Sequence, residues 1–242
     1  MEKKLRYKRV LLKLSGEVLA GDGTAGKNFD SATVREVCEA IRRCTADGIE
    51  VAVVVGGGNL IRGANAGALM GSRERADYLG MLGTVMNGLV LADALETLGV
   101  EARVVSAVNL DRVAEPYERG RVLRHLERGR VVIFTFGTGH PYFSTDTTAV
   151  LRAIEIGADL LLFAKNVDGV YDRDPNGLDA ARAVRLDSVS YNDIIKAELN
   201  VIDRTAAALG SVNGLKTRIF GMVPPERIYD AATGADVGTL VY

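Results

Sequence analysis

Residues 51–63 read VAVVVGGGNLIRG, and the rest of the chain can be interpreted outward from this stretch. Its first five residues are apolar and four of them are β-branched, which predicts a strand buried on both faces, as in a parallel sheet covered by helices. The three glycines that follow would let backbone N–H groups approach an anion closely, and Arg62 could hold the same phosphate. A tight strand-to-helix turn with a surface arginine explains these residues equally well.

The composition limits the classes of function. At 242 residues the chain suits one α/β domain of two lobes or two small domains, and its 30 basic and 31 acidic residues give a net charge of −1. No overall field would attract nucleic acid or a membrane, and the sequence has no basic stripe or aromatic platform for nucleic acid. The N-terminus lacks the apolar segment of a signal peptide and no apolar run approaches membrane-spanning length, so a soluble, cytoplasmic protein is expected.

The few cysteines and histidines predict neither a disulfide nor a metal centre. Cys38 and Cys44 are the only cysteines, and their six-residue spacing within one predicted helix directs them to different faces. His125 and His140 lie far apart in the sequence, so no zinc site is expected.

A lysine interrupts the first predicted strand, residues 10–14. Burying Lys13 costs desolvation unless its ammonium meets an anion or the end of the strand, and a Ser15-Gly16 turn follows at once. Residues 21–28 nearly spell a P-loop, but Asn28 replaces the hydroxyl residue that would bind Mg²⁺ and no buried strand leads into this segment. A surface loop is therefore expected at 21–28.

Strand-like and helix-like segments alternate along the remainder of the chain. Helices are predicted over residues 30–48, 74–98, 116–128 (with Pro116 in the first turn) and up to 156, and strands over 102–105, 131–134 and 160–163. Shorter elements are expected at 186–189, 191–198, 202–211, 217–220, after 225 and at 238–241. This alternation predicts an α/β fold, a three-layer sandwich with a mostly parallel central sheet covered by helices on both faces.

The helix predicted over 74–98 carries an unusually wide apolar stripe. The stripe consists of Leu79, Leu82, Met86, Leu89, Val90 and Leu95. Such a width predicts burial on more than one side, with a second subunit as the partner.

Two loops that follow predicted strands carry groups suited to a nucleotide. Residues 135–148 combine two glycines with several hydroxyls and Asp146 at a helix start, where free N–H groups favour a phosphate. Ser144 or Thr145 could instead cap that helix, and at least one of them is expected to do both. In residues 164–175, Tyr171 and Asp174 could hold a base and a ribose, whereas the Asp168-Gly169 pair could be only a turn.

Seven motifs, taken in order, resemble one known family. They are YKRVLLKLSGE (7–17), VVGGGNLIRG (54–63), RADYLGMLGTVMN (75–87), GTGHPYFSTDTTA (137–149), AIEIGADLLLFAKNVDGVYDRDP (153–175), IDRTA (202–206) and GTLV (238–241). Together they resemble the amino-acid-kinase superfamily and, within it, the bacterial uridylate kinases. The resemblance implies the amino-acid-kinase fold as a single domain, 1–242, with an N-terminal lobe of about 1–155 for UMP and a C-terminal lobe of about 156–242 for ATP.

The resemblance also implies a reaction and the residues that perform it. The activity would be transfer of the ATP γ-phosphoryl group to UMP, giving UDP and ADP in pyrimidine nucleotide biosynthesis, with Mg²⁺ carried by ATP and Asp146 nearby. The implied catalytic residues are Lys13, Arg62 and Asp146. The implied ATP-binding residues are Lys13, Ser15, Gly16, Gly58, Arg62, Asn166, Tyr171 and Asp174. The implied UMP-binding residues are Gly57, Asp77, Thr138, Gly139, His140, Pro141, Tyr142, Phe143, Ser144 and Thr145.

Departures from the family pattern leave a second hypothesis open. Phe136 and His140 stand where Gly and Asn are expected, and Phe163 stands where many relatives carry lysine, so that Lys165 would supply the positive charge. His140 fits a hydrogen bond within its loop better than a catalytic role, because phosphoryl transfer to a phosphate needs no strong base. The alternative function is a non-catalytic nucleotide- or oxyanion-binding storage or sensor protein. As partners, the resemblance implies a homohexamer built from dimers, with GTP and UTP as effectors.

Overall fold

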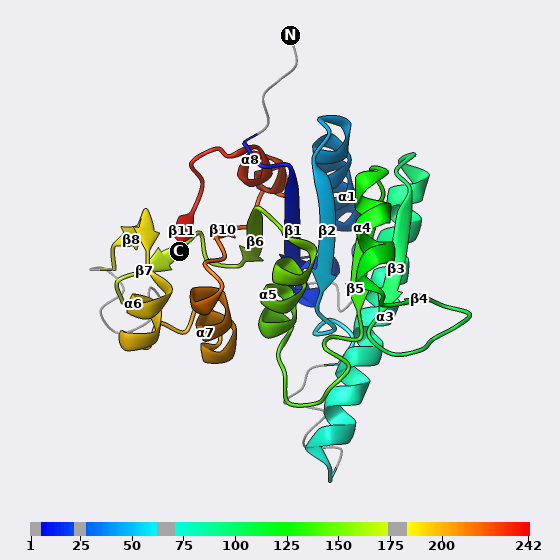
Figure 1. Ribbon diagram of the computed structural model, residues 1–242, viewed down its shortest axis with the longest axis horizontal. Coiled ribbons are helices and arrows are strands. Elements are labelled where there is room, and N and C mark those ends of the chain that lie inside the picture. Colours follow the sequence, from blue (N-terminus) through cyan, green and yellow to red (C-terminus); the bar gives the residue numbers. More distant parts are fainter. Residues whose placement is uncertain (1–5, 22–27, 62–70, 174–182) are drawn as a thin grey trace.

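The sheet at the centre of the molecule is almost entirely parallel. The computed structural model describes residues 6–21, 28–61, 71–173 and 183–242, and within these ranges nine strands form one sheet in the order β4-β3-β5-β2-β1-β6-β10-β11-β9 (Figure 1). The strands are β1 (Arg9–Leu14), β2 (Glu50–Val55), β3 (Ala102–Ser106), β4 (Glu115–Pro116), β5 (Val131–Thr135), β6 (Leu160–Lys165), β9 (Ser188–Val189), β10 (Thr217–Gly221) and β11 (Thr239–Val241). The β10–β11 pairing is antiparallel, and β7 (Val170–Tyr171) pairs separately with β8 (Arg185–Leu186).

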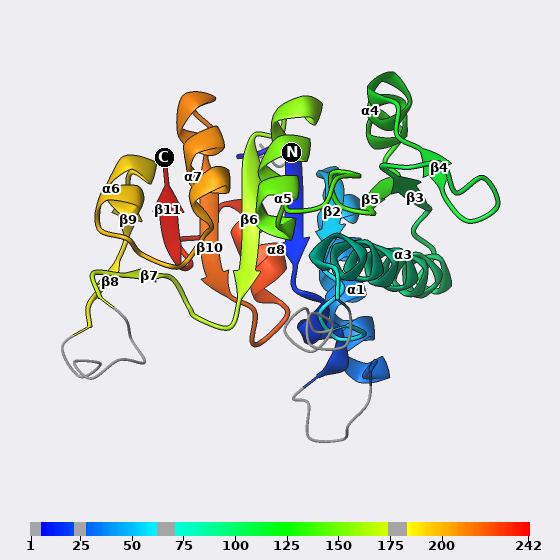
Figure 2. The ribbon, with the colours of Figure 1, turned by 90° about the horizontal axis from the view of Figure 1, so that it is seen from below.

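Helices cover both faces of this sheet. One face carries α1 (Ser31–Ala46), α3 (Arg73–Thr97) and α8 (Arg227–Thr233), and the other carries α4 (Arg119–Glu127), α5 (Thr145–Ile156) and α7 (Arg204–Val212), with α6 (Tyr191–Lys196) beside α7 (Figure 2). A short 3₁₀ helix, Gly16–Ala20, follows β1. The predicted three-layer α/β sandwich is confirmed.

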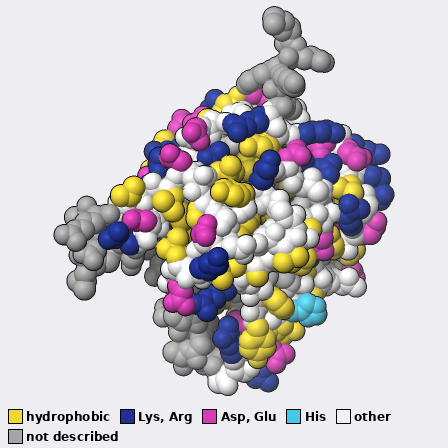
Figure 3. Space-filling view, turned by 60° about the vertical axis from the view of Figure 1, so that its left-hand side comes forward, with side chains coloured by type: hydrophobic (Ala, Val, Ile, Leu, Met, Phe, Trp, Pro, Cys, Tyr) yellow, Lys and Arg dark blue, Asp and Glu magenta, His cyan; other side chains and the backbone are white. Residues whose placement is uncertain are grey.

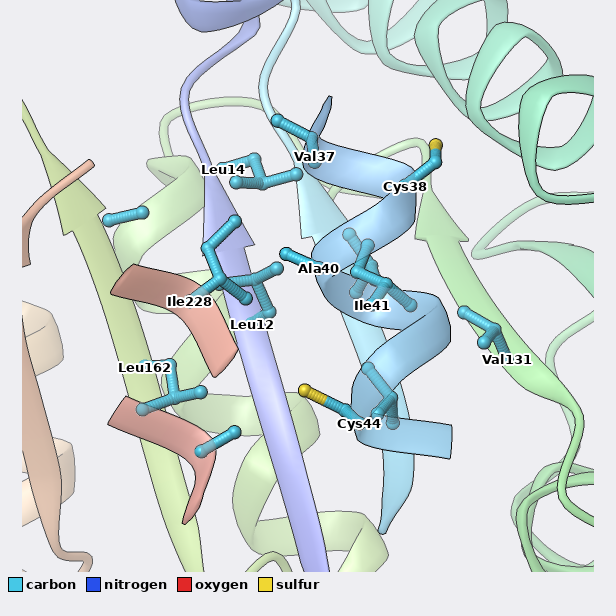
Figure 4. Packing of buried hydrophobic residues seen from close by; sticks show 14 of the residues in the cluster. Leu12, Leu14, Val37, Cys38, Ala40, Ile41, Cys44, Val131, Leu162 and Ile228 are labelled. Atoms are coloured by element: carbon cyan, nitrogen blue, oxygen red, sulfur yellow. The ribbon is translucent and has the colours of Figure 1, made fainter. Parts of the chain in front are cut away.

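Alternation along the strands divides the core into two apolar clusters. In β1, Leu12 and Leu14 pack in the cluster beneath α1 and α8 (Figure 4). Leu11 belongs to the cluster beneath α5. All three leucines are fully buried, as a strand covered on both faces requires. Lys13 shares the parity of Leu11, so the pleat directs its side chain toward α5.

Side-chain caps define where several helices begin. The Asp30 carboxylate accepts a hydrogen bond from the Thr33 N–H (2.9 Å) at the start of α1, and the Ser144 hydroxyl accepts one from the Thr147 N–H (3.0 Å) at the start of α5. Of the two candidate caps Ser144 and Thr145, the structure thus selects Ser144.

The prediction of a helix beginning at Pro116 is wrong. Residues 115–116 form β4, which pairs with β3 at the edge of the sheet, and α4 begins only at Arg119. An edge strand tolerates proline because the missing N–H can face solvent, so the same residue suits either element. The predicted element at 186–189 is likewise divided, since β8 and β9 belong to different sheets.

The burial of the apolar residues on α3 (Arg73–Thr97) differs from the prediction. Leu95 is buried, but Leu82, Met86 and Leu89 are 45%, 53% and 42% exposed, and together with Tyr78 they form an outward apolar face. Among the described residues, α3 is one helix long and apolar enough to cross a membrane by length and composition, contrary to the expectation that no apolar run approaches that length. The core helix of a soluble protein passes the same test, and the inward side of α3 packs against β3 and β5.

Charges of both signs are mixed over the surface. On the face shown in Figure 3, Lys and Arg side chains are interspersed with Asp and Glu, in keeping with the net charge of −1. No broad patch of one sign is visible on that face, which agrees with the absence of a basic stripe in the sequence.

Candidate active site

Two lysines share one carboxylate at the carboxyl ends of neighbouring strands. Lys13 lies on β1 and Lys165 ends β6, its parallel neighbour, while Asp146 lies in the first turn of α5. The Lys13 Nζ is 2.9 Å from Asp146 Oδ1, and the Lys165 Nζ is 2.8 Å from Asp146 Oδ2. Lys13 is only 8% exposed, so the expectation that this strand lysine meets an anion is confirmed.

The electrostatics of this group favour a further anion. Burial would raise the pKa of Asp146, but the ammonium groups of Lys13 and Lys165 outweigh it and hold that pKa below its ordinary value. Burial also lowers the pKa of Lys165, and Asp146 only partly opposes this shift. With both lysines protonated, the three side chains carry one net positive charge in a largely desolvated place, where an anionic ligand is attracted strongly.

Two glycine turns lie against each other beside the lysines. A Cβ on Gly16 would lie 2.6 Å from the Gly56 carbonyl oxygen, and a Cβ on Gly57 would lie 2.4 Å from the Gly80 carbonyl oxygen on α3. Both glycines are therefore required by close backbone packing. At Gly58 the nearest atom to an added Cβ is the Glu17 Cγ at 3.4 Å, an ordinary contact, so this glycine is free of that constraint. Arg62 lies outside the described residues.

A cavity of about 310 Å³ opens next to the glycine turns. Of the residues predicted to bind nucleotide, it is lined by Gly57, Gly58, Asp77, His140, Phe143, Ser144 and Thr145. Thr138, Gly139, Pro141 and Tyr142 belong to the same loop but do not line the cavity. The cavity therefore brings together residues from β2, α3 and the start of α5 that are distant in sequence.

The loop of residues 138–142 is held over the cavity by polar contacts. The Asp77 carboxylate accepts a hydrogen bond from the Tyr142 N–H (2.8 Å), and the Thr138 hydroxyl accepts one from the His140 N–H (3.2 Å). The within-loop hydrogen bond expected of His140 is thus made by its backbone, and its side chain is exposed.

Phe136, which departs from the family pattern, is buried against α3 and does not line the cavity. Its ring packs with Met81 and Val85 of α3 and lies 6.3 Å from the Tyr78 ring, and its φ of 62° falls in the left-handed region. The backbone N–H of Phe136 donates to the Thr84 hydroxyl (2.7 Å), which anchors the loop to α3.

A second cavity, of about 470 Å³, is lined by residues that follow β6 in the sequence, within 167–173 and 197–201. Tyr171 lines it, as do Val167 and Gly169, and the Tyr171 hydroxyl donates to Asp168 Oδ1 (2.7 Å). Asp168 thus orients the tyrosine in addition to forming a turn. Asn166 is exposed and lines neither of these two cavities, and Asp174 lies outside the described residues.

Sequence reasoning missed several residues that position these groups. Asp203 caps α7 through the Ala206 N–H (2.9 Å), accepts from the Thr147 hydroxyl (3.1 Å), and also accepts from the Ser144 hydroxyl, so it ties α7 to the start of α5. Asn87 is a fully buried amide in α3. An aspartate directly before an alanine-rich helix and a lone asparagine in an apolar helix were the available signals.

Comparison with known proteins shows the family of the chain. The model of the amino acid kinase family matches residues 8–221. A uridylate kinase of Streptococcus thermophilus is 50% identical over 237 residues, which cover 98% of this chain and 95% of that protein. The solved UMP kinases of Bacillus anthracis and Ureaplasma parvum are 38% and 33% identical, with TM-scores of 0.92 and 0.90, and the matches cover at least 96% of every chain. The chain therefore belongs to the amino acid kinase family and, within it, to the uridylate kinases.

Proposed function

We propose that this protein transfers the γ-phosphoryl group of ATP to UMP, giving UDP and ADP. The observation that carries the proposal is the Lys13–Asp146–Lys165 group. In the sequence, Asp146 and Lys165 stand close to residues that line the two cavities. Thr145, next to Asp146, lines the smaller cavity, and Val167, two residues after Lys165, lines the larger. A donor in one cavity and an acceptor in the other would direct their phosphates toward the same pair of ammonium groups.

Most of the catalysis in such a site would be positioning and neutralisation of charge. Two polyanions must approach each other, and the acceptor phosphate is already largely ionised at neutral pH, so no general base is needed. Phosphate oxygens would compete with Asp146 for Lys13 and Lys165, and these ammonium groups would then stabilise the charge that shifts to the leaving oxygen during transfer. Arg62 remains a prediction for the same task.

The acceptor is assigned to the smaller cavity. Asp77 on α3 lines it with a carboxylate that accepts from the Tyr142 N–H and has lone pairs left for the hydroxyls of a ribose, while the loop of 138–145 offers backbone groups and hydroxyls to a base. The ATP nucleoside is assigned to the larger cavity beside Tyr171, with Ser15, Gly16 and Gly58 toward the triphosphate.

The residues present fit a magnesium ion that arrives with the nucleotide. Among the described residues no group of three or more His, Cys, Asp or Glu side chains could hold a metal, and both oxygens of Asp146 are occupied by lysines. Mg²⁺ is commonly bound by substrate phosphates with only one or two carboxylates, so a protein cage is not required. Bound in this way, the ion would neutralise charge on the transferring phosphate, with Asp146 as the nearby carboxylate.

A coupled assay of ADP release with UMP, CMP and dUMP as acceptors tests the proposal. Rapid release with UMP, and much slower release with CMP and dUMP, is the expected result. Absence of ADP with every acceptor would contradict kinase activity and favour a nucleotide-binding storage or sensor protein. Preference for CMP would contradict the assignment of UMP and direct attention to His140.

The outward face of α3 supports self-association. Tyr78, Leu82, Met86 and Leu89 are 37–53% exposed at spacings of four, four and three residues, so they form one continuous apolar strip. We infer a dimer formed through this strip, and a cytoplasmic homohexamer built from such dimers with GTP and UTP as effectors. Sedimentation with and without each nucleotide tests the assembly, and a Leu82→Glu/Met86→Glu variant that sediments like the wild type would exclude this strip as the interface.

A further inference from the structure

An asparagine lies fully buried in the middle of helix α3. Asn87 has 0% exposure, and its helical neighbours Val85, Gly88 and Leu91 are buried as well. Burying an amide without hydrogen-bond partners is costly, and asparagine is a poor residue for a helix interior. Its presence therefore calls for a compensating set of hydrogen bonds.

That set is complete and involves a second asparagine. The Asn87 amide nitrogen donates to the Gly56 carbonyl (2.6 Å) and to Asn59 Oδ1 (2.7 Å). The Asn59 amide nitrogen donates to Asn87 Oδ1 (3.1 Å) and to the Asn28 carbonyl (2.7 Å). All four amide N–H groups of the Asn59–Asn87 pair are used, so the network has one well-defined geometry.

The pair stands where the two glycine turns meet. The oxygen Asn59 Oδ1 lies 2.6 Å from the position of a Cβ on Gly16, so it occupies the space that the glycine leaves free. The Gly56 carbonyl, which Asn87 holds, lies 2.6 Å from the same position, and the Gly56 N–H donates to the Leu14 carbonyl next to Lys13 (2.9 Å). A shift of the pair would therefore move both turns.

We propose that the Asn59–Asn87 pair is the positioning device that fixes the turn after β2 against the turn after β1, and through them the backbone beside Lys13. This proposal deepens the proposed function, on which it rests for its kinetic readout. Both asparagines are positioning residues. Asn87 is fully buried, and both N–H groups of the Asn59 amide donate to other protein groups. Their effect should fall on the transfer step, which requires alignment of the two phosphates.

The test compares Asn59→Ala, Asn87→Ala and the double variant by steady-state kinetics and thermal unfolding. A misplacement of about 1 Å can cost on the order of 10²-fold in rate, so kcat should fall about 10- to 100-fold in each single variant while the KM for UMP changes far less. Because the two amides act as a unit, the double variant should be no slower than the slower single variant.

Thr217→Val is the matched control. Thr217 is 0% exposed at the start of β10, at the opposite edge of the sheet from Lys165, and its hydroxyl is hydrogen-bonded to the Tyr191 hydroxyl (2.5 Å). Valine keeps its shape and removes one buried hydrogen bond, so Tm should fall while kcat stays at the wild-type value. This variant separates a loss of stability from a loss of alignment.

Three outcomes decide the proposal. A fall in kcat that is non-additive in the double variant supports it, whereas folded Asn59→Ala and Asn87→Ala proteins with kcat within about twofold of wild type, or strictly additive losses, would overturn it. If Asn87→Ala does not fold, Asn59→Ala decides, since Asn59 lies in a partly exposed turn.

A wild-type protein inactive with every acceptor would contradict the proposed function and not the positioning role. The rise in Tm produced by Mg·ATP then becomes the readout. It should shrink in Asn59→Ala and remain in Thr217→Val if the pair sets the phosphate-binding turns, and an unchanged rise in Asn59→Ala would overturn the inference.

Discussion

The Lys13 ammonium lies 2.9 Å from the Asp146 carboxylate, although Lys13 belongs to the first strand and Asp146 to helix α5, which is distant in sequence. Asp146 holds Lys165 with its second oxygen. A carboxylate between two ammonium groups keeps both charged side chains at the strand ends without a ligand. An incoming phosphate then meets a preorganised site, which is the most effective form of electrostatic stabilisation.

Replacing Lys13 by alanine should abolish most turnover without unfolding the protein. Loss of one preorganised contact to a developing charge typically lowers kcat by about 10²- to 10³-fold. ADP release under saturating substrates measures the loss, and near-UV circular dichroism checks the fold. Lys196→Ala removes an exposed lysine of α6 and should retain full activity. Near-normal turnover of Lys13→Ala would exclude Lys13 from the transfer step.

The alkaline side of the pH–rate profile should report Lys165. Burial lowers its pKa below the ordinary value of lysine, so its charge is present at lower pH and is lost as the pH rises through that depressed pKa. Activity should therefore fall on that side. Lys165→Arg should move the fall to higher pH, because a guanidinium stays protonated there. An alkaline limb in the same place in Lys165→Arg would assign it to another group.

Asp77→Ala should weaken the binding of UMP and leave the binding of ATP nearly unaffected. Its carboxylate lines the smaller cavity and also holds the Tyr142 N–H at 2.8 Å, so the variant loses a ribose partner and loosens the loop above it. A hydrogen bond to a charged group is worth about 1.5–3 kcal/mol, which corresponds to a KM for UMP raised roughly 10- to 100-fold. Asp93→Ala, an exposed position on the same helix, is the control. Equal increases in the two KM values would contradict the assignment.

The glycines of residues 56–58 should separate into two classes. A methyl group on Gly57 would collide with the Gly80 carbonyl of α3 at 2.4 Å, so Gly57→Ala should destabilise the fold by about 1–3 kcal/mol. Gly58→Ala meets only an ordinary contact at 3.4 Å and should fold normally, but it should bind ATP more weakly if Gly58 faces phosphate. Urea unfolding and ATP titration of both variants measure these effects.

This division shows what the sequence could and could not provide. A run of valines ending in glycines is enough to predict a buried strand and a turn, and a lysine inside an apolar strand predicts either an anionic partner or a place at the end of the strand. Whether a given glycine is required for backbone packing or is free to face a ligand depends on which helix backbone lies against it. That approach is a tertiary contact between the turn after β2 and α3, and no local pattern in residues 51–63 encodes it.

The same limit explains the residues that were missed or misplaced. The partners of Asn87 are the Gly56 carbonyl and the Asn59 side chain in a turn distant in sequence, so the burial of Asn87 could not be predicted from the apolar pattern of α3. That pattern also could not distinguish the inward leucines from Leu82 and Leu89, because both sides of the helix are apolar. Pro116 fits an edge strand and a helix start equally well, and only the pairing with β3 decides between them.

Arg152 should prove to be a residue of stability and not of catalysis. It is 5% exposed, its guanidinium stacks 3.8 Å from the centroid of the Tyr117 ring, and it pairs with Glu155 at 2.6 Å. The Tyr117 hydroxyl donates to the same carboxylate (2.7 Å), and burial together with Glu155 raises the pKa of Tyr117 to about 12, so the tyrosine remains a donor at every working pH.

Arg152→Ala would leave Glu155 without its ion-pair partner and Tyr117 without its stacking partner. Removing one member of a buried pair costs about 3–5 kcal/mol, and the free energy of unfolding in urea should fall by that amount. Arg121→Ala breaks only surface pairs at 3.7 and 3.9 Å and should cost less than about 1 kcal/mol. At a temperature where Arg152→Ala is still folded, its kcat should match the wild type, because Arg152 lines neither of the two cavities described above. A loss of kcat with unchanged stability would instead place Arg152 in the transfer step.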